Sequence, residues 1–120
     1  MYQNGYQQYK MQSVNTMTRG EMLLLLYDEL VKRLTKAELA LEKEEFDTSV
    51  KRAQEIVQYL QETLNTEYSI SRDLQRMYDF FLYEISRLQA GRKKTVIEEL
   101  RPLVIELRDA FREANKTSGI

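Results

Sequence analysis

The sequence predicts an all-α protein, an antiparallel four-helix bundle preceded by a flexible or loosely docked N-terminal arm. Apolar residues recur at helical spacing in four separate segments, and only one proline and four glycines occur in 120 residues. No segment alternates polar and apolar residues with period two over the length of a strand, so β-structure is not expected. Four helices of roughly 18 to 25 residues joined by short loops favour an antiparallel bundle.

The first element is an arm, residues 1–15, followed by a helix predicted over residues 19–43. The arm has no helical stripe but carries tyrosines, of which Tyr6 and Tyr9 are candidates to dock on the bundle. Thr18 and Glu21 form a capping box, in which each side chain satisfies a free backbone N–H of the first turn. The apolar stripe of this helix is Leu23, Leu26, Leu30, Leu34 and Leu41.

The second and third helices are predicted over residues 47–65 and 71–90. Asp47 and Ser71 are suitable N-caps, because their side-chain oxygens can accept from N–H groups of the first turn. Gly91 fits a C-terminal cap of the third helix. The two stripes are Val50, Ala53, Val57, Leu60 and Leu64, and Ile70, Leu74, Met77, Tyr78, Phe81, Ile85 and Leu88.

The fourth helix is predicted over residues 96–115, and the bundle over residues 16–116, with 117–120 as a tail. Thr95 and Glu98 form a second capping box. Pro102 lies inside this helix, where a proline costs about 3 kcal/mol unless a bend relieves it. Because the apolar stripe keeps its phase across Pro102, we predict a kink rather than a break.

Composition excludes several functional classes. The 18 Lys and Arg residues nearly balance 19 Asp and Glu, which argues against a protein that mainly grips nucleic acid. With no cysteine or histidine, Cys/His zinc sites and His-based nucleophilic sites are excluded, and we expect no enzyme activity, metal or cofactor. A basic cluster at Arg87, Arg92, Lys93 and Lys94 is interpreted as complementing a helix C-terminus rather than binding nucleic acid. No secretory signal or membrane-spanning run is visible, so a cytoplasmic protein is expected.

Several apolar side chains fall off the stripes that face the bundle interior, and these are the candidate partner-binding residues. They suggest a groove for an amphipathic helix, although single surface hydrophobics are normal. The alternative is a self-associating helical-bundle interaction protein with a different helical partner, whose spare apolar faces bury against each other in a dimer. The expected state is therefore a monomer or weak homodimer. Together with Tyr6 and Tyr9 of the arm, the candidates are Leu24, Tyr27, Val31, Ile56, Tyr59, Phe80 and Tyr83.

Three motifs in order resemble the flagellar secretion chaperones, the export chaperones of flagellin. Tyr9, Val14, Thr16 and Thr18, with Glu-Met-Leu-Leu-Leu-Leu-Tyr-Asp at 21–28, resemble the opening pattern of that family. Residues 74–80 are similar to its Leu-x-x-Leu-Tyr-Asp-Tyr motif, and residues 107–111 to its Leu-Arg-x-Ala-Trp signature.

The chain departs from the family pattern at three places. Arg19-Gly20 replaces a proline-containing helix start, Phe111 replaces a tryptophan, and Pro102 has no counterpart. The resemblance implies a protein that binds the C-terminal segment of flagellin, masks it against premature polymerisation and keeps it competent for export. It places Tyr9 near the partner, and it makes the flagellar export gate a further candidate partner.

Overall fold

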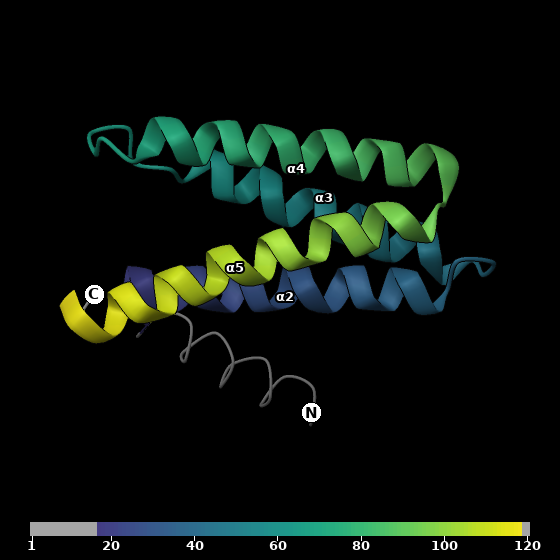
Figure 1. Cartoon of the computed structure of the whole chain (residues 1–120), viewed down its shortest axis with the longest axis horizontal. Helices are drawn as coiled ribbons and strands as arrows, with labels where there is room; N and C mark the ends of the chain where they lie inside the picture. The colour runs from purple at the N-terminus through teal and green to yellow at the C-terminus, as the bar shows by residue number, and fades with distance from the viewer. Residues whose placement is uncertain (1–16, 119–120) are drawn as a thin grey trace, which may run out of the picture.

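The computed structural model describes residues 17–118, which form four helices and no strand. The helices are α2 (Arg19–Leu39), α3 (Glu45–Glu62), α4 (Ser71–Gly91) and α5 (Lys94–Ser118). Consecutive helices run in opposite directions, and α2 packs against both α3 and α5, while α4 packs against α3 and α5 (Figure 1). The predicted fold class, an antiparallel four-helix bundle, is confirmed.

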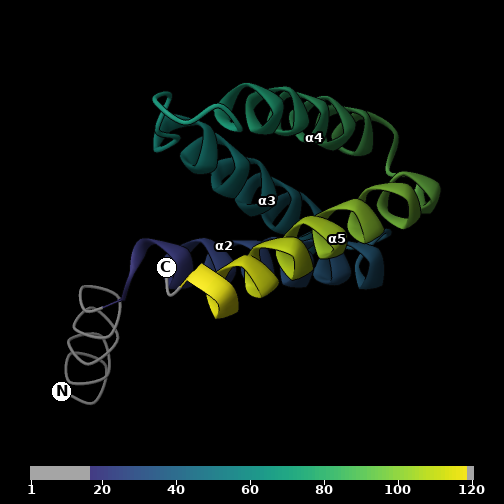
Figure 2. The same cartoon turned by 60° about the vertical axis from the view of Figure 1, so that its left-hand side comes forward.

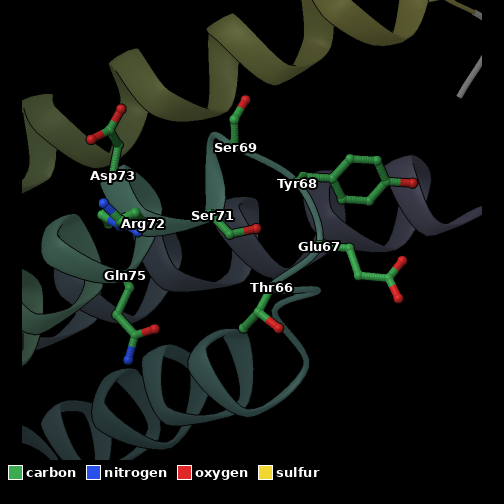
Figure 3. Close-up of a pocket in the computed structure, with 8 residues that line it drawn as sticks. All are labelled: Thr66, Glu67, Tyr68, Ser69, Ser71, Arg72, Asp73 and Gln75. Atoms are coloured by element: carbon green, nitrogen blue, oxygen red, sulfur yellow. The ribbon is translucent and has the colours of Figure 1, made fainter.

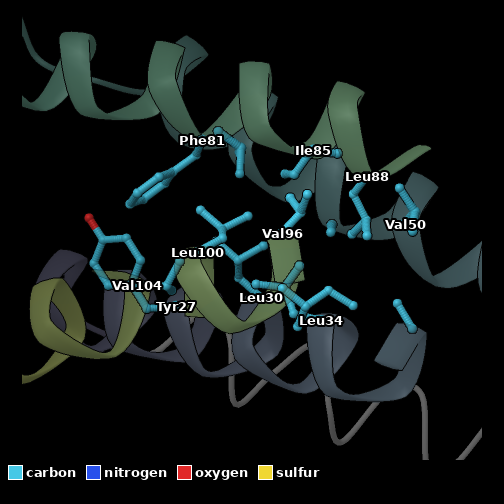
Figure 4. Close-up of a cluster of buried hydrophobic side chains, with 14 of the residues drawn as sticks. Tyr27, Leu30, Leu34, Val50, Phe81, Ile85, Leu88, Val96, Leu100 and Val104 are labelled. Atoms are coloured by element: carbon cyan, nitrogen blue, oxygen red, sulfur yellow. The ribbon is translucent and has the colours of Figure 1, made fainter. Parts of the chain in front are cut away.

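The core is built from the predicted stripes of all four helices. Leu30 and Leu34 of α2, Phe81 of α4 and Val104 of α5 are fully buried and point into one shared interior (Figure 4). A fully buried aliphatic or aromatic side chain contributes about 1.5–3 kcal/mol. The period of the apolar residues therefore defines which face of each helix turns inward.

The start of α2 is as predicted, whereas its end is not. Thr18 is the N-cap, and its hydroxyl accepts from the Glu21 N–H at 3.1 Å. The helix ends at Leu39, four residues before the predicted end, because Ala40 leaves helical geometry and its N–H bonds back only to Ala37. The chain can then turn early enough for Phe46 to enter the core.

The predicted caps of α3 and α4 are wrong. α3 begins at Glu45, so Asp47 lies inside the first turn, where its carboxylate accepts from Arg92 at 2.9 Å instead of capping. Ile70 holds the N-cap position of α4, and the Ser71 hydroxyl donates to the Asn65 carbonyl across the preceding turn. In both cases another hydrogen bond takes the side chain that the local sequence assigns to capping, 45 residues away for Asp47 and six residues away for Ser71.

The end of α4 and the start of α5 also differ from prediction. Gly91 remains helical, and Arg92 is the residue that takes the left-handed conformation, at φ 51°. α5 begins at Lys94, so Thr95 lies within the helix rather than capping it. α5 continues without interruption through Pro102, while the kink itself stays a prediction.

Arg92 accepts an unfavourable backbone conformation because its side chain fastens α4 to the turn between α2 and α3. Its guanidinium donates to the Leu41 carbonyl at 3.1 Å and pairs with Asp47. The same group lies 4.7 Å above the centre of the Phe46 ring, a cation–π contact. The basic residue at this helix end therefore has a structural role.

Replacing Arg92 separates these two effects. We expect Arg92→Ala to lower the free energy of unfolding by about 1–2 kcal/mol, because the pair is largely exposed and contributes modestly. Arg92→Gly should be about 1 kcal/mol more stable than Arg92→Ala, since glycine adopts positive φ without strain. Urea denaturation of the three proteins measures both. Equal stability of Arg92→Ala and the wild type would show that the side-chain contacts contribute nothing.

Candidate functional site

An apolar pocket opens at the end of the bundle where α4 and α5 separate. The two helices meet at their connecting turn and diverge toward the opposite end (Figure 2). There the start of α2, the end of α3, the turn into α4 and the end of α5 enclose a space of about 440 Å³, called the end pocket below. Its lining residues are Arg19, Gly20, Leu23, Leu60, Thr63, Leu64, Asn65, Tyr68, Ile70, Ser71, Leu74, Tyr78, Phe111, Ala114 and Asn115.

The floor of the end pocket is aromatic and uncharged. The hydroxyls of Tyr27 and Tyr78 lie 2.5 Å apart in the interior and hydrogen-bond to each other, joining α2 to α4. Phe111 packs on Tyr27, with ring centres 5.5 Å apart. Burial raises the pKa of both tyrosines above the ordinary value, so both phenols stay neutral in the folded protein. The floor is therefore suited to apolar side chains.

The rim is fixed by contacts between helix ends. The Arg19 guanidinium donates to the Thr63 carbonyl, which ties the start of α2 to the end of α3. Between α3 and α4, the turn places Tyr68 and Ile70 at the mouth, and Ile70 is 56% exposed. An exposed apolar mouth above an apolar floor is typical of a site that binds another apolar surface.

A second pocket, of about 640 Å³, lies at the same turn (Figure 3). It is lined by polar and charged side chains of the connection between α3 and α4 and of the start of α4, among them Thr66, Arg72, Asp73 and Gln75. Over residues 17–118, no group of three acidic side chains is placed to hold a metal ion. In the same range, no helix is long and apolar enough to cross a membrane.

The predicted site residues on α2 lie in different places. Tyr27 belongs to the core beneath the end pocket and is 0% exposed, so its side chain is not accessible to a partner in this structure. Leu24 and Val31 are half-buried and share a helical face with Asp28, which pairs with Arg108 of α5 at 3.0 Å. They therefore lie along the seam between α2 and α5. Tyr6 and Tyr9 lie outside the described residues.

The predicted residues on α3 and α4 point to two further faces. Ile56 is partly buried against the core and Tyr59 is more exposed. They share a helical face with Thr63, which contacts α2. Phe80 and Tyr83 are exposed on α4, outside the end pocket. None of the predicted residues lines the end pocket, so the seven within the described range do not form one groove with it.

The apolar helix residues that do line the pocket have the sequence pattern that predicts a core position. Leu23, Leu64, Leu74 and Phe111 belong to apolar stripes or to the resembling motifs. The available sequence signal was the turn before α4, where an apolar Ile70 follows a polar run and Tyr68 adds an aromatic ring. Apolar side chains in a surface turn indicate contact with another surface.

The class that the structure defines is an all-α four-helix bundle that opens at one end into an apolar pocket. Comparison with known proteins identifies the family. Residues 2–118 match the family described as flagellar protein FliS. A curated relative, the flagellar secretion chaperone FliS of Bacillus subtilis strain 168, is 31% identical over 115 residues, which cover 93% of this chain and 86% of the relative. The chain therefore belongs to the FliS family of flagellar secretion chaperones.

The fold agrees with this assignment. A crystal structure of a bacterial flagellar chaperone matches with a TM-score of 0.79, covering 98% of this chain and 99% of the other. The two sequences are only 18% identical, so this likeness concerns the fold alone.

Proposed function

We propose that this chain binds the C-terminal segment of flagellin in the cytoplasm, prevents its premature polymerisation and keeps it competent for export. The open, apolar end pocket is the observation that supports the proposal most strongly. Its mouth exposes Ile70 and Tyr68, while its floor is formed by Tyr78 and Phe111. Such a surface fits the apolar face of an amphipathic helix.

Binding of this kind couples folding of the partner to association. A disordered segment loses chain entropy when it becomes ordered, at a cost of about 2–5 kcal/mol or more, so a large apolar area must be buried to compensate. The end pocket covers only the end of the bundle. Leu24, which is half-buried on α2, and Tyr59, which is exposed on α3, are therefore proposed as additional contacts along a wrapped segment.

Calorimetric titration tests the proposal directly. The probe is a peptide covering roughly the last 50 residues of flagellin from the same organism, with circular dichroism recorded on the mixture. We expect 1:1 binding with micromolar or tighter affinity, a gain in helix beyond the sum of the parts, and a negative heat-capacity change. A folded protein that shows no heat of binding and no gain in helix would contradict the proposal.

Self-association is a second candidate, favoured by exposed apolar residues along α4 and α5. Met77, Phe80 and Leu103 are each 38–44% exposed. A dimer that covers these side chains would bury them against a second copy. Light scattering at increasing protein concentration tests this, and a mass that stays at 14.3 kDa would exclude a dimer at those concentrations.

A further inference from the structure

One polar atom in the end pocket has no hydrogen-bond partner. The side-chain amide nitrogen of Asn115 is buried and is unpaired in the described part of the chain. Native proteins contain few such atoms, and each destabilises the folded state because it has lost its hydrogen bonds to water. An asparagine at this position is therefore not explained by the stability of the bundle.

Its position on α5 directs Asn115 toward the pocket. Asn115 follows Phe111 by four residues and Arg108 by seven, so the three share one face of the helix. On that face Arg108 pairs with Asp28 of α2, and Phe111 packs on Tyr27 in the core beneath the pocket. Asn115 thus extends the same face to the end of the bundle, where it lines the end pocket.

The other polar side chains around the pocket are accounted for. Tyr68 is exposed to water, and the remaining ones bond within the chain. Three of them donate to carbonyls: Arg19 to that of Thr63, the Thr63 hydroxyl to that of Tyr59, and Ser71 to that of Asn65. The Asn65 side chain accepts from the Glu67 N–H, and the Tyr78 hydroxyl bonds to that of Tyr27. The free donor of Asn115 is therefore an exception within this pocket.

We infer that Asn115 is a partner-binding residue of the end pocket: its side chain turns on binding, so that the amide, buried in the free protein, donates a hydrogen bond to a main-chain carbonyl of the bound flagellin segment. This inference rests on the proposed function. An apolar pocket disfavours a charged acceptor, whereas a neutral carbonyl satisfies the donor without burying a charge. Free carbonyls occur in the last turn of a helix, which also presents apolar side chains. The end pocket thus takes the C-terminal turn of a bound amphipathic helix.

The variant Asn115→Leu separates a recognition role from a structural one, because leucine has a similar size and no polar atom. We expect the midpoint of urea unfolding to rise, since the unpaired donor is removed. We expect the affinity for the flagellin C-terminal peptide to fall about tenfold, since one partner carbonyl is then buried without a donor. Opposite changes in stability and affinity are the signature of a binding residue. A purely structural residue would not give them.

Two further variants make the test specific. In Asn115→Asp the donor is replaced by a carboxylate facing the partner carbonyl, and the affinity should fall at least as far as in Asn115→Leu. The matched control is Gln58→Leu, the same amide-to-leucine change at an exposed position of α3 outside the pocket. For Gln58→Leu we expect unchanged affinity.

The outcomes distinguish this inference from the proposed function. If the wild type does not bind the peptide, both fail. If the wild type binds and Asn115→Leu binds equally well or more tightly, the inference alone is overturned. A loss of stability in free Asn115→Leu that disappears on deleting residues 1–12 would identify the chain's own N-terminal segment as the acceptor, and would likewise overturn the assignment to flagellin.

Discussion

Replacing Ile70 by glutamate is expected to weaken binding of the flagellin C-terminal peptide by about 10- to 100-fold, or about 1.4–2.8 kcal/mol. Ile70 lies at the mouth of the end pocket, where a bound apolar segment would remove a carboxylate from water without supplying a partner. Stability should change little, because Ile70 is exposed and a negative charge at the start of α4 is favourable. Calorimetry measures the affinity, and urea denaturation checks the fold.

Two matched substitutions show whether the effect belongs to the end pocket. Leu39→Glu places the same charge on an apolar residue that is 75% exposed, at the opposite end of α2, and should leave the affinity unchanged. Tyr83→Glu tests the outer face of α4, which the sequence favoured. If Tyr83→Glu abolishes binding and Ile70→Glu does not, the contact surface is the outer face of α4 and the end pocket is not the site.

The fold could be predicted because its main determinant is periodic. Leu30, Leu34, Val57 and Leu100 recur at helical spacing and are all buried. A helix that carries such a stripe has to bury it, and four stripes joined by short connections leave few arrangements other than a bundle. Fold class therefore follows from a pattern that neighbouring residues in the sequence already show.

The helix ends could not be predicted as well, because tertiary contacts compete for the capping side chains. Asp47 is bound by Arg92, which lies 45 residues later in the sequence. Local rules favour a glycine for the left-handed position after a helix, but Arg92 adopts it, and the neighbouring Gly91 stays helical. No local rule identifies a side chain that is already bonded to a distant residue.

The candidate site was missed for a related reason. Leu23, Leu64 and Phe111 have the spacing of core residues, and they remain partly accessible because α4 and α5 separate at this end. Conversely, Tyr27 extends an apolar run that resembles surplus surface, yet it is fully buried. Its hydroxyl is satisfied by Tyr78, 51 residues away. Whether a neighbouring helix covers an apolar residue depends on where the helices diverge, and the spacing of apolar residues in the sequence does not predict that.

The same tyrosine pair predicts a steep loss of stability in alkali. Burial raises the pKa of both Tyr27 and Tyr78 in the fold, whereas tyrosines of the unfolded chain ionise near pH 10. The unfolded chain therefore releases its protons first. The contribution of the pair to stability is fully present below about pH 10 and falls as the pH rises further. The two groups together should remove about 2 kcal/mol of unfolding free energy between about pH 10 and pH 11.

The contribution of the tyrosine pair to the free energy of unfolding can be measured by urea denaturation across this pH range. The comparison is between the wild type and the double variant Tyr27→Phe/Tyr78→Phe, because the other groups that titrate there are common to both proteins. The double variant should lose about 2 kcal/mol less over the same interval, while Tyr83→Phe, at an exposed position of α4, should follow the wild type.

Near neutral pH, either single Phe variant should lower the free energy of unfolding by about 1–3 kcal/mol, because one hydroxyl is left buried without a partner. The double variant should cost less than the two single variants added together, because it removes both hydroxyls of one bond. Additive losses at neutral pH, or an unchanged alkaline slope, would mean that the two hydroxyls reach water and that the floor of the end pocket is not closed beneath a bound segment.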